Sequence, residues 1–253
     1  TINRYQNPFI FSVGFPILHR NPSAMSHLEN FVSKEDIILL PVPGIPEQRY
    51  RDCFYNKKIV WAGRIIFMQT LCETAAIHWS LRQLQNDSTL NLSILLGWNK
   101  NEVIDIVNGE VDRDIKLDIN DYFWNKPIFL PYLNIRDRVK LEYSLFWEQM
   151  LDIYSQAKIS TLYGKGFGGP PLEAAMYGVP FVASAKTGAL ADCDNYLFAD
   201  SEEEACKIFD KLMSDHSFYN QTACAYNKYA IDNYSFSAFN RNLNSILKQR
   251  GIS

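Results

Sequence analysis

The feature of the sequence that most constrains the fold is an alternation between short apolar runs and segments with helical spacing. The apolar runs lack a polar face, and most of them stop at a glycine or a proline. We interpret them as strands covering 8–15, 35–43, 57–64, 90–98, 126–133, 158–164, 179–185 and 195–199. Strands that are apolar on both faces are typical of parallel sheets covered by helices. The sequence therefore predicts an α/β fold with a Rossmann-like open parallel sheet and helices on both faces.

The segments between these runs carry apolar residues at helical spacing. Candidate helices cover 26–32, 68–79, 144–157, the stretch that starts near Pro170, 201–212 and 236–250. Ser201 and Glu204 have the spacing of a capping box, which predicts a helix start. Gly178 stands where a glycine ends a helix. Ligands of open parallel sheets bind beyond the carboxyl ends of the strands, so the residues after each strand are the ones to search for a site.

The composition narrows the classes of function. Of the 253 residues 47% are hydrophobic, which is enough for a sizeable core, and the formal net charge of −3 gives no support to nucleic-acid binding. No apolar stretch approaches the roughly 20 residues of a membrane span. The five cysteines and four histidines form neither a CxxC pair nor a set with metal-ligand spacing. This pattern is typical of free thiols in a reducing compartment.

The glycine-rich loop "GKGFGG", residues 164–169, joins a predicted strand to a predicted helix. The N-terminus of a helix offers free N–H groups and the positive end of its dipole, and glycines let the backbone approach a bound anion. The loop is therefore a candidate phosphate cradle. Its spacing differs from GxGxxG and from GxxxxGK[ST], so on composition alone an ordinary strand-to-helix turn is the alternative.

Glu173 is the lone carboxylate in the apolar helix that follows this loop. We place it in the first turn, where the helix dipole stabilises a negative charge by about 0.3–1 kcal/mol. A carboxylate at this edge of the sheet can accept hydrogen bonds from two adjacent ribose hydroxyls. The alternative is a solvated acid that suits the dipole and has no ligand.

The stretch "GKGFGGPPLEAAMYGVPFVASAKTGALAD" resembles the signature of retaining glycosyltransferases of family 4, which have two Rossmann-like domains in the GT-B fold. "VWAGRI" and "ILLGW" upstream are similar to two strands of that family, in the same order. The resemblance covers 41–235 and implies a nucleotide-sugar-binding Rossmann-like domain. It implies that 1–40 are a remnant of an N-terminal acceptor domain with the hinge, and that 236–253 form the C-terminal crossover helix.

The resemblance also implies roles for individual residues. Glu173 matches the acid that binds the nucleotide ribose, and Arg64 matches the arginine that binds the donor diphosphate. The backbone of the loop matches the segment near the donor sugar and phosphates. The candidate catalytic residues are thus Lys165 and Arg64. The candidate donor-binding residues are Glu173, Gly166, Phe167, Gly168, Gly169, Pro170, Gly63, Gln69, Gly188 and Asp192.

Two positions depart from the family pattern. Lys165 stands where the family has the first glutamate of its motif, and Gln69 stands where it usually has a phosphate-binding lysine. A lysine cannot accept hydrogen bonds from a sugar hydroxyl. Three explanations stay open: Lys165 neutralises the phosphates, Lys165 pairs with a carboxylate on the donor sugar, or the domain binds without catalysing.

By this resemblance the chain is the donor-binding domain of a metal-independent, retaining glycosyltransferase acting in polysaccharide biosynthesis. The donor would be a UDP- or GDP-sugar, with no other cofactor, and the acceptor a glycan, lipid-linked glycan or protein. We expect the missing N-terminal Rossmann domain as a partner, no nucleic acid, and a cytoplasmic location, with association at a membrane surface left open. The alternative function is a non-catalytic nucleotide or sugar-nucleotide binding domain, and a sugar-nucleotide epimerase is a more distant one.

Overall fold

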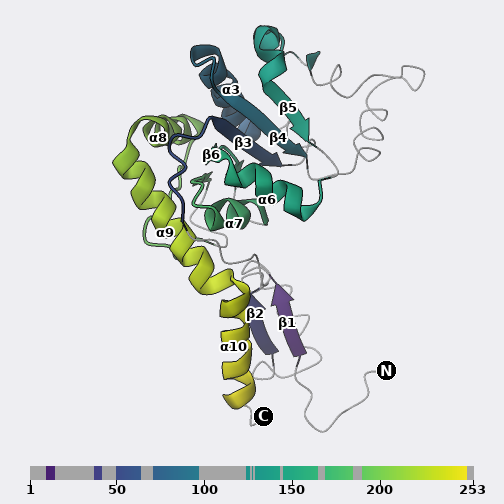
Figure 1. The fold of residues 1–253 in the computed structure, drawn as a ribbon, viewed down its shortest axis with the longest axis vertical. Coiled ribbons are helices and arrows are strands. Elements are labelled where there is room, and N and C mark those ends of the chain that lie inside the picture. Colours follow the sequence, from purple (N-terminus) through teal and green to yellow (C-terminus); the bar gives the residue numbers. More distant parts are fainter. Residues whose placement is uncertain are drawn as a thin grey trace, which may run out of the picture.

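The computed structural model describes residues 10–14, 37–41, 50–63, 71–96, 124–125, 127, 129–142, 145–164, 169–184 and 190–249. Its main sheet is four-stranded and parallel, in the order β5-β4-β3-β6 (Figure 1). The strands are β3 (Lys58–Gly63), β4 (Asn91–Leu96), β5 (Val139–Glu142) and β6 (Ala157–Ser160). The predicted open parallel sheet is therefore confirmed.

Helices cover both faces of this sheet. Side chains alternate between the faces of a strand, and Ile59 and Trp61 of β3 pack in one buried cluster with Ile77 of helix α3 (Leu71–Asn86). Val60 and Ala62 point the other way, into a cluster with Tyr154 of α6 (Trp147–Ser155) and Ala174 of α7 (Gly169–Met176). A fully buried aliphatic side chain contributes about 1.5–3 kcal/mol, so the two clusters hold the helices against the strands.

The order of the strands reverses between β3 and β6. The chain runs outward from β3 through β4 to β5 and then returns by α6 to β6, on the other side of β3. In open α/β sheets such a reversal leaves a crevice at the carboxyl ends of the two strands, and ligands bind there. Strand β3 ends at Gly63 and β6 leads into 161–164. The two predicted site segments that follow these strands therefore begin at this crevice.

A second, smaller layer follows the main sheet. Strands β7 (Tyr163–Gly164) and β8 (Val182–Ala183) pair in parallel, and α7 lies between them in the chain. Helix α8 (Glu202–Ser214) packs on α3, whereas α9 (His216–Tyr234) packs on α7. Helix α10 (Phe236–Gln249) lies beside β2 (Ile37–Pro41), which pairs in parallel with β1 (Ile10–Gly14) (Figure 1).

Three helix signals in the sequence are confirmed. The side chain of Ser201 accepts a hydrogen bond from the N–H of Glu204, and the Glu204 carboxylate accepts from the N–H of Asp200. Gly178 has φ +66° just after α7. Its N–H donates to Ala175 and that of Val179 donates to Ala174, the bond pattern of a Schellman motif. The final helix is present as α10, and the predicted helix at 26–32 lies outside the described residues.

The strand predicted at 126–133 is wrong. Residues Leu130–Arg138 form a 3-10 helix, η3, and the strand β5 comes after it. Pro131 explains the difference, since proline lacks the N–H that a central strand needs and suits the first turn of a helix. Strand β5 was not predicted, because it lies at the edge of the sheet and only half of its residues are apolar.

The later strands are shorter than predicted. The run at 158–164 divides into β6 and β7, and the run at 179–185 contributes only β8. The last predicted strand, 195–199, amounts to one bridge between Phe198 and Ala183. Backbone bonds from Ala183 to Leu197 and from Ala199 to Ala183 hold that bridge.

Candidate functional site

The predicted site residues divide into two groups. Arg64, Gln69, Lys165, Gly166, Phe167, Gly168 and Gly188 lie outside the described residues. Gly63, Gly169, Pro170, Glu173 and Asp192 lie within them. The described part of the candidate site therefore consists of the strand ends, the start of α7 and the surroundings of Glu173.

The segment after β6 is fixed against β3 and α3. The N–H of Thr161 donates to the carbonyl of Val60 over 2.8 Å, which extends the pairing of the two strands by one step. The Thr161 hydroxyl lies 3.0 Å from the Ser80 hydroxyl of α3, and both side chains are buried. Buried hydroxyls that are paired in this way order the backbone around them. The chain thus enters 162–164 from a rigid position beside the carboxyl end of β3.

Helix α7 begins at Gly169, so Pro170 and Pro171 lie in its first turn. Proline is favoured there because its missing N–H has no helical partner to lose. The sequence placed Glu173 in that first turn, but the earlier start at Gly169 moves it one turn further in. This corrects the expected electrostatics, since the effect of the dipole is confined to the first turn.

Burial dominates the chemistry of Glu173. The side chain is partly exposed, yet its Oε2 atom is buried and has no hydrogen-bond partner among the described residues. Burial disfavours the charged form and raises the pKa of the carboxyl group to about 7. A buried acid with an unsatisfied oxygen at the edge where ligands bind is a functional-site candidate.

Tyr154 lies on the neighbouring helix α6 and was not singled out by the sequence. It is in the last turn of α6, is fully buried, and packs in one cluster with Ala174, the neighbour of Glu173. Its hydroxyl has no hydrogen-bond partner among the described residues. No sequence signal distinguishes Tyr154 from an ordinary apolar position of its helix.

Asp192 is exposed in a turn that packs beside α7. Leu190 and Cys193 of this turn are buried in the same cluster as Leu172 of α7, and the N–H of Cys193 donates to the carbonyl of Leu190 over 2.9 Å. The turn therefore holds Asp192 next to the helix that carries Glu173, and its predicted role in donor binding stays a prediction.

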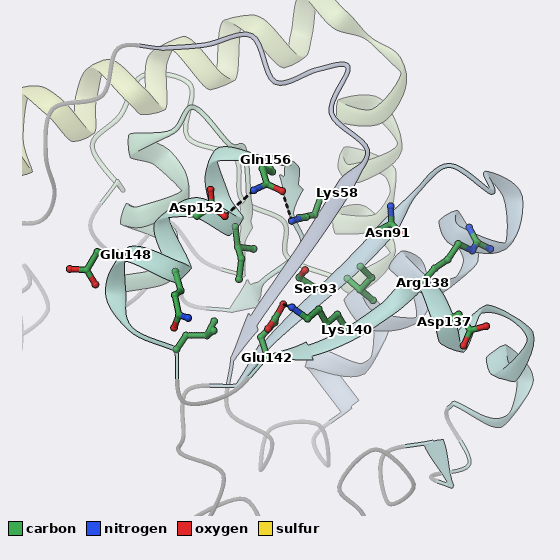
Figure 2. Close-up of a pocket in the computed structure, with 14 residues that line it drawn as sticks. Lys58, Asn91, Ser93, Asp137, Arg138, Lys140, Glu142, Glu148, Asp152 and Gln156 are labelled. Carbon is green, nitrogen blue, oxygen red and sulfur yellow. Dashed lines mark hydrogen bonds and ion pairs between the residues drawn. The ribbon is translucent and has the colours of Figure 1, made fainter.

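A cavity of about 630 Å³ lies elsewhere, between α6 and strands β4 and β5 (Figure 2). Its sheet floor carries Asn91 and Ser93 of β4 and Lys140 and Glu142 of β5, an alternation that the sequence analysis missed. None of the predicted site residues that the structure describes lines it.

Several charged side chains of this cavity already have polar partners. Lys140 lies 2.7 Å from Glu142, and Lys58 donates over 2.9 Å to Gln156, which in turn donates over 3.0 Å to Asp152 (Figure 2). Such a lining offers no excess positive charge for a phosphate. We therefore place the candidate site at the strand ends near Glu173 and not in this cavity.

Each of the two described histidines, His78 and His216, has a polar partner. The ring of His78 lies 3.2 Å from the Tyr132 hydroxyl, and burial lowers its pKa. His216 is ion-paired with Asp52 at 2.8 Å on the surface. Within the described ranges no group of three or more histidines, cysteines and acids is arranged to hold a metal ion. No described helix combines the length and the apolar character that a bilayer crossing requires.

The comparisons with known proteins bear on the fold. No protein-family model and no curated protein matches the chain. The structure is similar to sucrose-phosphate synthase from Thermosynechococcus elongatus, with TM-score 0.56 and 14% identity over 94% of this chain and 58% of that one. It is similar to Anabaena HepE in complex with UDP-glucose, with TM-score 0.55 and 13% identity over 98% and 65%.

A third similar structure is assigned as a UDP-N-acetylglucosamine 2-epimerase from Listeria monocytogenes. Its TM-score is 0.51, with 15% identity over 92% of this chain and 59% of that one. The chain therefore spans less than two thirds of the length of each of these structures. The matches show the fold, which is that of the C-terminal domain of GT-B glycosyltransferases, as predicted. Membership of family 4 stays a prediction.

Proposed function

We propose that the chain supplies the donor-binding domain of a glycosyltransferase that uses a nucleotide-diphosphate-sugar. The observation that carries the proposal is Glu173, a partly buried acid with an unpaired Oε2 on the helix that starts beside the reversal of strand order. An ionised Glu173 carboxylate would need hydrogen-bond donors, and a ribose presents two of them as adjacent hydroxyl groups. Binding would stabilise the charged form of Glu173 and so offset the effect of its burial.

The phosphates would lie between the loop and the end of β3. Arg64 follows Gly63 directly, and a guanidinium suits the fork geometry of a diphosphate. The loop 166–169 and Pro170 would bring backbone close to the donor sugar, with Gln69, Gly188 and Asp192 around it. Donors fixed in this way stabilise the leaving diphosphate as it gains charge, which requires no metal ion. Transfer with retention is the mechanism that the motif resemblance implies.

Lys165 decides between catalysis and binding. We propose that it neutralises the phosphates in place of the lysine that Gln69 replaces. Pairing with a uronic-acid donor and a non-catalytic binding domain are the two alternatives, and the second is favoured by the change of charge at both motif positions. The similar HepE structures are complexes with UDP-glucose and with UDP and glucose, so UDP-sugars are the first donors to test.

The complete enzyme would need a second domain for its acceptor. We propose that 41–235 bind the donor, that 1–40 belong to the hinge and acceptor domain, and that 236–253 return towards it. Helix α10 lies beside β2, which is consistent with this division. The acceptor would be a glycan, a lipid-linked glycan or a protein. Such a reaction fits polysaccharide biosynthesis in the cytoplasm or at a membrane surface.

The test is a thermal-shift panel with UDP, GDP, ADP and their sugars. A ligand at 100–1,000 times its Kd should stabilise the protein by about 2.7–4.1 kcal/mol. Glu173→Ala should abolish the shift, whereas Glu148→Ala, which changes an exposed acid on α6, should preserve it. Flat responses to all nucleotides would refute the proposal.

Turnover separates the alternatives that involve Lys165. Lys165→Glu should lower both donor affinity and sugar transfer or donor hydrolysis, and Lys165→Ala should lower them less. If Lys165→Glu changed neither quantity, Lys165 would have neither active role. Nucleotide binding without any turnover in the protein joined to its acceptor domain would favour the non-catalytic alternative. Conversion of a bound UDP-N-acetyl sugar to its epimer would favour the epimerase.

A further inference from the structure

The two strands at the reversal of strand order separate after Thr161. Up to this residue the chain of β6 lies beside β3, and the N–H of Thr161 donates to the carbonyl of Val60 over 2.8 Å. Strand β3 then continues beside β4 as far as Gly63. The chain that follows Thr161 pairs instead with β8, as strand β7. Thr161 is therefore the residue at which the two sides of the candidate site part.

Two consecutive hydrogen bonds join this point to helix α3. The hydroxyl of Ser80 donates over 2.8 Å to the carbonyl of Ala76, one turn earlier in the helix, and lies 3.0 Å from the hydroxyl of Thr161. A hydroxyl has only one proton to donate, although it can accept as well. Because the proton of Ser80 is engaged with Ala76, the Thr161 hydroxyl is the donor in the second bond.

Burial makes this connection strong and specific. The side chains of Ser80 and Thr161 are both 0% exposed, so water does not compete for their bonds. Hydrogen bonds that follow one another in a low-dielectric interior strengthen each other. The neighbouring hydroxyl, that of Ser160, is buried and has no partner in the part of the chain that the structure describes. Thr161 thus provides a polar link between this strand and α3.

The two ends of the link lead to two predicted donor-binding segments. Thr161 comes shortly before the glycine-rich loop at 164–169. Helix α3 begins at Leu71, directly after the segment that carries Arg64 and Gln69, and it packs on β7. A bond between Thr161 and α3 therefore fixes the start of the loop relative to the helix that follows the other segment.

We propose that Ser80 and Thr161 are positioning residues, whose hydrogen bond holds the glycine-rich loop in the place where it binds a diphosphate. Neither side chain touches the ligand, since both are fully buried. Such a contact matters because a misplacement of about 1 Å, caused far from the chemistry, can cost about 100-fold in rate. The diphosphate rests on the function proposed above, whereas the ordering of 161–164 by the bond does not.

The direction of the two bonds makes the single substitutions unequal in their effect on stability. Thr161→Val is nearly isosteric and leaves Ser80 bonded to Ala76, so it should lower the midpoint of urea unfolding only slightly. Ser80→Ala leaves the buried Thr161 hydroxyl without its acceptor, which is the more costly change. The double variant removes both polar groups and should regain part of the stability that Ser80→Ala loses.

Binding of UDP, measured by titration calorimetry, separates positioning from stability. The Kd should rise about tenfold in both single variants and stay raised in the double variant, because all three lack the link. Thr161→Ser keeps the hydroxyl and should keep the affinity. Thr222→Val is the matched control, since Thr222 is 1% exposed and its hydroxyl donates to Phe218 within α9. It should lower stability without changing the Kd.

Hydrogen exchange of the backbone N–H groups of 161–164 tests the ordering itself, without any ligand. A segment that has lost its link opens more often, so exchange there should be about tenfold faster in Thr161→Val. It should be unchanged in Thr161→Ser and in Thr222→Val. Exchange of helix α10, which packs on α9 and β2, should be the same in every variant and serves as the internal reference.

The outcomes separate this inference from the proposed function. If exchange of 161–164 is the same in Thr161→Val as in the wild type, the inference is wrong whatever the protein binds. If UDP binds all variants equally, or the double variant regains affinity together with stability, the pair is merely structural and the inference is also wrong. Faster exchange in a protein that binds no nucleotide would support the ordering and refute the proposed donor. Faster exchange with weaker binding in the restabilised double variant would support both.

Discussion

Gly178 and Tyr50 approach so closely that a Cβ atom on Gly178 would lie 2.5 Å from Cδ2 of Tyr50. Gly178 also has φ +66°, in the left-handed region that side chains disfavour. Two independent constraints therefore require glycine at the end of α7. The contact joins the helix that carries Glu173 to the segment that leads into β3.

Gly178→Ala should lower the free energy of unfolding by about 2 kcal/mol or more, since strain in the backbone and a clash with the Tyr50 ring add together. Urea unfolding measures the loss. In a Tyr50→Ala background the same substitution should cost only about 1–2 kcal/mol, the part due to backbone strain. Equal losses in the two backgrounds would show that the ring can move aside without cost.

The role of Gly178 was predictable from the sequence because helix endings are local signals. The same is true of the cap at Ser201 and of the alternation that predicts a parallel sheet, since each depends on neighbouring residues alone. Strand β5 was not predictable in this way, because its half-apolar sequence reflects its position at the edge of the sheet. Helix η3 does have a local signal, Pro131, which argues against the strand predicted at 126–133.

The candidate site also combines features that the sequence indicates with features that depend on tertiary packing. Glu173 stands out in the sequence as one acid in an apolar helix, but the burial that raises its pKa depends on how α7 packs against the rest of the fold. Tyr154 could not be predicted from the sequence, because a tyrosine that only fills the core and one whose hydroxyl has a role occupy the same kind of helix position. What decides between them is the packing of α6 on α7.

Asp210 joins α8 to α3, and its removal should destabilise the fold. Its carboxylate accepts from Trp79 Nε1 over 2.8 Å and from Gln83 over 3.2 Å. Because Trp79 is buried, Asp210→Ala would leave its indole N–H unpaired and should cost about 1–3 kcal/mol in urea unfolding. Glu203→Ala, which removes an exposed ion pair with Lys207 on the same helix, should leave stability unchanged, because solvent screens such a pair. Similar losses in the two variants would contradict this assignment.

Glu173 should make the protein less stable as the pH rises. Its pKa is raised from 4.5 to about 7 in the folded protein, so the folded state holds a proton that the unfolded state has released between these values. The stabilisation is complete below pH 4.5 and is lost as the pH rises through 7. Partial exposure reduces the size of this effect, which we expect to be about 2–3 kcal/mol.

Glu173→Gln should remove this dependence, because an amide does not titrate. The variant should therefore gain stability relative to the wild type between pH 5 and pH 8, as measured by urea unfolding at both values without ligand. It should lose nucleotide binding at pH 8, since an amide accepts from one ribose hydroxyl where a carboxylate accepts from two. Glu148→Gln, at an exposed position on α6, should show neither change. A gain in stability is expected whether or not Glu173 binds a ligand, because a residue kept for binding often costs stability. If the variant also kept its affinity, Glu173 would be a buried acid without a ligand.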